Sequence, residues 1–188
     1  SEKLLISYFD ATDFDNHQQF YNDLPVKPSI VLYAAGFLVQ NEEAIPDFEK
    51  TFTMMKVHYC GALSMLNIIV MDYENTRLRK IIGLSSLSGV RGRKSNFIYG
   101  STKAAFTQYL AGLRQYLFPR KVTVNVIVAG YIRSKMTAGL GLTESLMLEP
   151  VFIAKAVVNA GSRFTIVPGF KWKIIYNMLR IMPEGLVA

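Results

Sequence analysis

Ser86, Tyr99 and Lys103 are the residues whose types and spacing most clearly suggest chemistry. Tyr99 and Lys103 are four residues apart, so a helix over this segment would place both side chains on one face. A free tyrosine titrates near pKa ~10, and an adjacent ammonium group favours the ionised phenol. The pair is therefore suited to give or take a proton near neutral pH, with Ser86, thirteen residues upstream, holding a substrate carbonyl beside it.

A second Tyr-x-x-x-Lys pair, Tyr131 and Lys135, shows how specific this spacing is. The second pair follows a strand pattern and a glycine instead of starting a long helix. Phe118, and no serine, stands thirteen residues before Tyr131. We therefore interpret the second pair as coincidental and the pair at Tyr99 as functional.

The context of Tyr99 is more specific than the pair itself. Ser85, Ser86 and Gly89 form a Ser-Ser-x-x-Gly sequence after a strand pattern, and Tyr99 and Lys103 follow on the next helix pattern. This arrangement resembles the short-chain dehydrogenase/reductase family. The resemblance implies hydride transfer from NAD or NADP, with Tyr99 as general acid and Ser86 positioning the carbonyl oxygen. Lys103 would lower the pKa of Tyr99 and hold the nicotinamide ribose.

The composition indicates one globular domain over residues 1–188, with 51% hydrophobic residues and a mean hydropathy of +0.22. No stretch reaches the ~20 apolar residues that a membrane span needs. The single cysteine, Cys60, excludes an intramolecular disulfide, and neither histidine belongs to a metal-ligand cluster, so we expect no metal and a cytoplasmic location. The net charge of +7 is scattered, without the aromatic-interleaved basic strip of nucleic-acid binders.

Strand and helix patterns alternate along the chain. The expected strands are Leu4–Phe9, Ile30–Ala34, Lys80–Leu84, Val122–Val128 and Phe164–Val167. The expected helices cover about Asp13–Asp23, Pro46–Tyr73, Asn96–Phe118, Pro150–Asn159 and Phe170–Ile181. This alternation predicts an α/β fold with a doubly wound, Rossmann-like parallel sheet that binds ligands beyond the carboxyl ends of its strands.

One family element is not found in the sequence. The family's first strand is followed by Gly-x-x-x-Gly-x-Gly, which holds the cofactor pyrophosphate at a helix N-terminus. No such loop precedes Asp10, and the first strand pattern resembles the family's third strand. We therefore expect the domain to be N-terminally incomplete, without the first β-α-β unit; a true remnant is the alternative.

The resemblance also implies cofactor contacts. Asp10 and Ala11 open an Asp-x-x-Asp sequence whose first carboxylate would receive the adenine amino group, although Asp10 is also suited to cap the next helix. The further cofactor positions follow later strands: Ala34, Ala35 and Gly36 at the adenosine ribose, and Gly130, Ile132 and Ser134 at the carboxamide and pyrophosphate.

His58 stands where the family has an asparagine on its long central helix. That asparagine distorts the helix and exposes a backbone carbonyl to a water that links the lysine to solvent. The imidazole of His58 either relays a proton itself or is a packed structural group. The sequence leaves both interpretations open.

Two further sequence segments resemble one branch of the family. Residues 93–103 and 132–137 are similar to the branch that contains the reductase subunit of decaprenylphosphoryl-ribose 2-epimerase, whose members reduce a keto sugar on a polyprenyl phosphate. This implies a small-molecule or lipid-linked carbonyl substrate. Arg91, Arg93 and Lys94 either contact an anionic substrate at the entrance or form a solvated loop, and the segment from Met136 to Glu149 has the composition of a mobile lid.

The amphipathic segment Lys171–Met182 fits a membrane interface, a cover for the pocket or a subunit contact. Membrane contact would place the protein at the inner face of the membrane. The family commonly forms homo-oligomers, which we expect here by resemblance. The competing class is a truncated, non-catalytic member that serves as a binding or scaffold protein.

Overall fold

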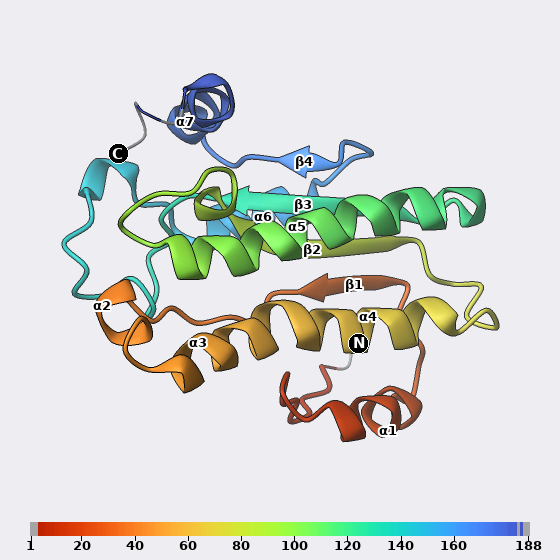
Figure 1. Cartoon of the computed structure of the whole chain (residues 1–188). Coiled ribbons are helices and arrows are strands. Elements are labelled where there is room, and N and C mark those ends of the chain that lie inside the picture. Colours follow the sequence, from red (N-terminus) through yellow and green to blue (C-terminus); the bar gives the residue numbers. More distant parts are fainter. Residues whose placement is uncertain (1–3, 184, 186–188) are drawn as a thin grey trace.

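The computed structural model describes residues 4–183 and 185. Its centre is a parallel sheet of four strands whose order in space follows their order in the chain (Figure 1). The strands are β1 (Ile30–Tyr33), β2 (Lys80–Ser86), β3 (Thr123–Ala129) and β4 (Thr165–Ile166). The predicted α/β fold with a parallel, Rossmann-like sheet is confirmed.

Helices fill the connections between the strands. They are α1 (His17–Asn22), α2 (Asn41–Ala44), α3 (Phe48–Met55), α4 (Gly61–Met71), α5 (Phe97–Leu117), α6 (Pro150–Val158) and α7 (Phe170–Ile181). A π-helical turn, Lys56–Cys60, joins α3 to α4 without a break. The long helix expected from Pro46 to Tyr73 is therefore one continuous run with a local distortion at His58.

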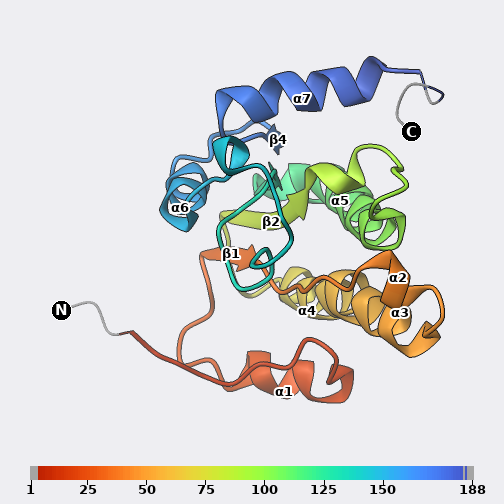
Figure 2. The ribbon, with the colours of Figure 1, turned by 90° about the vertical axis from the view of Figure 1, so that its left-hand side faces the viewer.

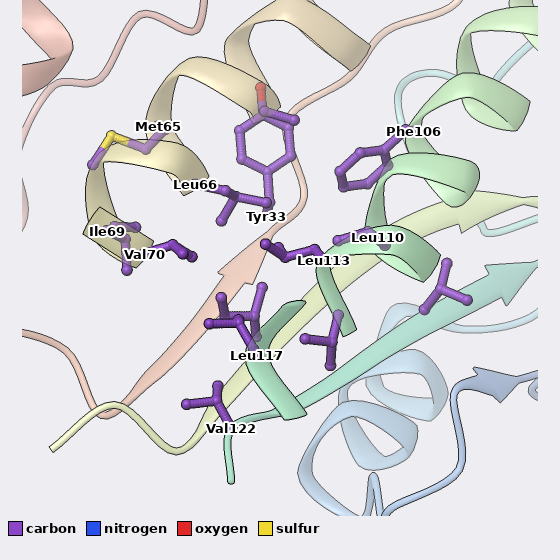
Figure 3. Packing of buried hydrophobic residues seen from close by; sticks show 14 of the residues in the cluster. Tyr33, Met65, Leu66, Ile69, Val70, Phe106, Leu110, Leu113, Leu117 and Val122 are labelled. Atoms are coloured by element: carbon purple, nitrogen blue, oxygen red, sulfur yellow. The ribbon is translucent and has the colours of Figure 1, made fainter. Parts of the chain in front are cut away.

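The sheet is covered on both faces because successive strand residues point to opposite sides. On one face, Leu66 of α4 and Phe106 and Leu110 of α5 pack in the larger core (Figure 3). On the other face, Ile153 of α6 packs in a smaller cluster with Ile127 of β3. Both faces of β2 and β3 are thus apolar, as the continuous hydrophobic runs predicted.

The strand predicted at Leu4–Phe9 is wrong. Residues 4–10 have no strand structure, and Leu4, Ile6 and Tyr8 are exposed by 85%, 87% and 86%. Strand geometry depends on a paired neighbour, and no described strand pairs with this segment. Its end is held by His17 instead, which stacks on the Phe9 ring at 5.0 Å and bonds to the Asp10 carbonyl at 2.9 Å.

The helical run Phe48–Met71 has the length and apolar composition to cross a membrane. However, Ala62, Leu66 and Ile69 from this run are buried in the core beneath β1 and β2. This is the packing of a core helix.

Candidate active site

A cavity of about 500 Å³ opens beyond the carboxyl ends of β1, β2 and β3. The pairing of β2 with β3 places Ser86 directly beside Ala129 at this edge of the sheet. The cavity is lined by the residues after each strand and by the first turns of α5, including Ala34, Gly36, Ser86, Tyr99, Lys103, Gly130, Ile132 and Ser134. Of the predicted cofactor positions, Asp10, Ala11 and Ala35 lie outside this lining.

The three candidate catalytic residues are brought together by two neighbouring elements. Ser86 ends β2, whereas Tyr99 and Lys103 lie on successive turns of α5. The Lys103 Nζ atom lies 5.8 Å from the centre of the Tyr99 ring and donates to the Leu84 carbonyl at 3.3 Å. The Ser86 Oγ accepts the Ser88 N–H at 3.1 Å.

Burial decides the proton affinities of these groups. Loss of hydration raises the pKa of Tyr99 to about 12, against the opposite effect of the nearby Ser86 hydroxyl. Burial lowers the pKa of Lys103 to about 8 because it disfavours the ammonium form. The expectation that Lys103 lowers the pKa of Tyr99 is therefore not met in this structure: Tyr99 keeps its proton at neutral pH.

His58 is fully buried, and both of its ring nitrogens are engaged. Its Nε2 accepts the Phe37 N–H at 3.0 Å, and its Nδ1 lies 2.7 Å from the Thr102 Oγ1. The Thr102 hydroxyl donates to the Tyr99 carbonyl at 2.8 Å, so Nδ1 must carry the proton toward Thr102. Burial, together with the charge of Lys103, lowers the pKa of His58 to about 3. This arrangement favours the structural interpretation of His58 over the proton relay.

Asp10 holds a local turn. Its Oδ1 accepts both the Thr12 N–H and the Thr12 hydroxyl at 2.8 Å, and these hydrogen bonds lower the pKa of the carboxyl. Asp10 therefore stabilises a turn within the loop, and the alternative that it caps the next helix is not seen. The adenine contact remains a prediction.

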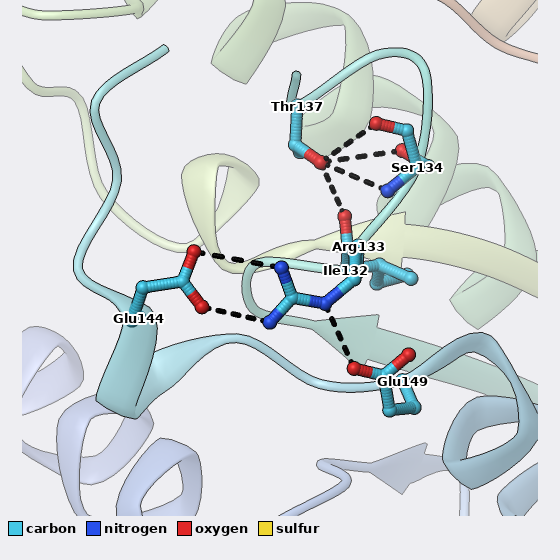
Figure 4. Close-up of polar contacts among 6 residues, drawn as sticks. All are labelled: Ile132, Arg133, Ser134, Thr137, Glu144 and Glu149. Atoms are coloured by element: carbon cyan, nitrogen blue, oxygen red, sulfur yellow. Dashed lines mark hydrogen bonds and ion pairs between the residues drawn. The ribbon is translucent and has the colours of Figure 1, made fainter. Parts of the chain in front are cut away.

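Two ion pairs and a hydroxyl hold the segment after β3 (Figure 4). Arg133 pairs with Glu144 at 2.7 Å and with Glu149 at 2.8 Å, which ties the start of the segment to its end. The Thr137 hydroxyl donates to the Ile132 carbonyl at 2.6 Å and accepts the Ser134 N–H at 3.1 Å. These contacts join the start of the loop to its end, and the loop forms one wall of the cavity; its movement as a lid remains a prediction.

The sequence analysis did not assign two residues that hold the elements around the cavity in place. Tyr33 donates to the Val57 carbonyl at 2.6 Å and so joins the end of β1 to the π-helical turn Lys56–Cys60. Trp172, the only tryptophan in the chain, lines the cavity and donates to the Leu146 carbonyl at 2.9 Å. A side chain at Gly130 would lie 2.0 Å from the Trp172 ring, so Gly130 is required for this packing.

The donors of the cavity fit the nicotinamide end of NAD or NADP. An ammonium group has three donors, and among the described residues Lys103 donates only to the Leu84 carbonyl, which leaves donors for ribose hydroxyls. Gly36 keeps the adjacent space open, because a Cβ at that position would lie 3.2 Å from the Lys103 Nζ. The part of the chain that the structure describes contains no glycine-rich pyrophosphate loop.

A family model and several known proteins match this chain. The family model described as short chain dehydrogenase matches residues 1–145. An uncharacterized oxidoreductase of Mycobacterium tuberculosis is 24% identical over 186 residues, which cover 94% of this chain and 72% of the relative.

Solved structures show the same fold. A short chain dehydrogenase from Burkholderia cenocepacia in complex with NADP has a TM-score of 0.81 at 20% identity, covering 95% of this chain and 74% of its own. A short chain dehydrogenase from Mycobacterium paratuberculosis bound to NAD has a TM-score of 0.73 at 19% identity, covering 85% of this chain and 70% of its own.

Proposed function

Because the chain belongs to the short-chain dehydrogenase family, we propose that this oxidoreductase transfers a hydride between NAD or NADP and a ketone/secondary alcohol pair. The observation that carries the proposal is the convergence of Ser86, Tyr99 and Lys103 on one cavity beyond the strand ends. The bound nicotinamide supplies the hydride, for which no side chain can substitute.

The roles of the three residues follow from their positions and proton affinities. The Ser86 hydroxyl donates a hydrogen bond to the substrate oxygen and holds that oxygen beside Tyr99, the proton donor. Tyr99 donates its proton to that oxygen as the alcohol forms, since a pKa of about 12 keeps the phenol protonated at neutral pH. Lys103, as the ammonium form below its pKa of about 8, stabilises the phenolate that remains.

The remaining contacts to the cofactor are proposals on the same basis. Gly36, Gly130, Ile132 and Ser134 line the cavity beside the catalytic residues, and Ala34 joins them after β1. We assign these residues to the cofactor as the family resemblance implies. Asp10, Ala11 and Ala35 are assigned to the adenosine end, outside the cavity lining.

A keto sugar on a polyprenyl phosphate is our finer proposal for the substrate, within the broader class of small carbonyl compounds. The similarity to the reductase subunit of decaprenylphosphoryl-ribose 2-epimerase supports it. Arg93 lines the cavity and donates to the Ser88 Oγ at 3.1 Å, and Leu140 and Leu142 provide apolar walls. We further propose a single domain over residues 1–188, a homo-oligomer, and a location in the cytoplasm or at the inner face of the membrane.

The experiment for this function is a binding titration of the full-length protein with NADH and NADPH. Trp172 lines the cavity, so a bound reduced nicotinamide should quench its emission in a saturable way. The Trp172→Phe variant should lose the quenching signal while calorimetry still detects binding. If calorimetry detects neither cofactor, hydride transfer is excluded and the scaffold alternative is favoured.

His58 is expected to act by positioning the loop after β1 against α5. The His58→Leu variant leaves the Phe37 N–H without its acceptor, which costs about 1–3 kcal/mol, whereas the Thr102 hydroxyl keeps its hydrogen bond to the Tyr99 carbonyl. We expect lower stability and at least a tenfold lower kcat/KM. In the parent enzyme, the rate should show no inflection between pH 5 and 7, since the pKa of His58 lies at about 3.

The Thr102→Val variant is the matched test of this network. It leaves the His58 Nδ1–H unpaired, so the double variant with His58→Leu should lose less than the sum of the single losses. A proton relay through His58 predicts a different result, namely an inflection near pH 6–7 in the parent that disappears in His58→Leu.

A further inference from the structure

Helix α7 has two apolar faces. Its inner face carries Trp172 and Leu179, which are only 5% and 8% exposed and pack in the larger core. Its outer face carries four exposed apolar side chains, namely Phe170 at 77%, Ile174 at 45%, Met178 at 48% and Ile181 at 83%. Figure 2 shows α7 at the outside of the molecule, at the end opposite α1.

The outer apolar residues form one continuous stripe. Residues 170, 174, 178 and 181 recur at helical spacing, so at about 100° per residue they fall on the side opposite Trp172 and Leu179. A helix that only covered a core would carry polar residues on this side. Packing within the fold therefore does not explain why the outer side of α7 is apolar.

Basic side chains border the stripe on both sides. At helical spacing, Lys171 lies along one edge, and Lys173 and Arg180 lie along the other. All three are exposed, and the helix Phe170–Ile181 contains no acidic residue. An apolar stripe between two basic edges is the pattern of a helix that lies in a membrane interface.

We propose that the outer face of α7 docks on an anionic lipid surface, with the apolar stripe at the boundary between headgroups and acyl chains. Lys171, Lys173 and Arg180 would then face the negative headgroups. This docking needs neither the cofactor nor the reaction proposed above.

A second copy of the chain fits this face less well. A two-fold contact would place the same patch of each protomer against the other. The basic residues Lys171, Lys173 and Arg180 of one protomer would lie close to the basic residues of the other, which is unfavourable without intervening anions. An anionic membrane complements the same charges.

The inner face of α7 connects this surface to the cavity. Trp172 lines the cavity, and Lys171 donates to the Ser145 carbonyl, in the loop after β3, at 3.0 Å. A helix lying on the membrane would therefore hold the cavity wall directly above the lipid surface.

The test is sedimentation of the full-length protein with vesicles. We expect binding to vesicles of phosphatidylglycerol and phosphatidylcholine, and much weaker binding to phosphatidylcholine alone. The Phe170→Ser/Ile181→Ser variant should bind at least about tenfold more weakly, since it removes the two most exposed apolar side chains of the stripe. Val158→Ser on α6 is the matched control, because Val158 is equally exposed at 81% but lies on another helix; its binding should be unchanged.

Two more variants separate charge from apolar contact. Lys173→Gln/Arg180→Gln should reduce the preference for anionic vesicles, and Phe170→Trp should shift its emission to the blue when those vesicles are added. All variants should melt near the parent temperature, because the changed side chains are exposed. Absence of sedimentation with either vesicle, or equal loss in Val158→Ser, overturns the proposal. So does conversion of an oligomer to monomers by Phe170→Ser/Ile181→Ser, which would assign this face to a second copy.

Discussion

Replacing Tyr99 with phenylalanine is expected to lower kcat/KM for ketone reduction by about a thousandfold, the typical contribution of a positioned general acid. The phenol lines the cavity beside Ser86 and Lys103, and its pKa of about 12 makes it a donor at neutral pH. Phenylalanine keeps the ring and removes only the hydroxyl group that carries the proton. Binding of NADH or NADPH should change little, so calorimetry and steady-state kinetics together locate the defect in the proton transfer.

Tyr116→Phe is the matched control for Tyr99→Phe. Tyr116 lies on the same helix, but it is 55% exposed and its hydroxyl contacts the Tyr73 hydroxyl at 2.9 Å on the surface. Its activity should equal that of the parent. If Tyr99→Phe retains more than about a tenth of the parent activity, the proton comes from another group and the assignment of Tyr99 is wrong.

Gly61→Ala is expected to destabilise the protein by about 2 kcal/mol, within the range for an overpacked site. Helix propensity alone predicts the opposite sign, since alanine is favoured over glycine by up to ~1 kcal/mol. However, a Cβ at Gly61 would lie 2.2 Å from the Ala11 carbonyl oxygen, a backbone atom that cannot move without the loop after Asp10. Denaturant unfolding should therefore show a lower midpoint with an unchanged slope.

Gly112→Ala provides the contrast on α5. A Cβ at Gly112 would meet no atom within 4 Å, so propensity alone should act, and the substitution should stabilise the fold by up to about 1 kcal/mol. Opposite signs for the two glycines would confirm the close approach of α4 to Ala11. A stabilising effect of Gly61→Ala would show that the Ala11 loop does not lie there.

Local sequence patterns were sufficient for most of the fold and for the centre of the site. The helix at Tyr99 and Lys103 depends on a period of 3.6 residues, which is visible in the chain itself, and Ser86 follows a strand marked by its apolar run. The second pair, Tyr131 and Lys135, was set aside by the same local reasoning, and no helix joins these two residues in the structure.

Contacts between distant segments could not be read in this way. Leu4–Phe9 has the composition of a strand, but a strand needs a partner, and composition does not report whether one is present. His58 was ambiguous for a similar reason: Phe37 and Thr102, which occupy its two nitrogens, lie on other elements. The second apolar stripe of α7 became visible only when Trp172 and Leu179 were seen to be the buried side.

The chain by itself determined the order of strands and helices, the sheet edge where the site forms, and the residues Ser86, Tyr99 and Lys103 within it. These features follow from periodicity and short spacings. Tertiary structure decided the proton affinities, because the pKa values of Tyr99 and Lys103 respond mainly to how much water the surrounding segments exclude. It also decided that His58 holds two segments together, since a hydrogen-bond partner is set by packing across the fold and not by neighbours in sequence.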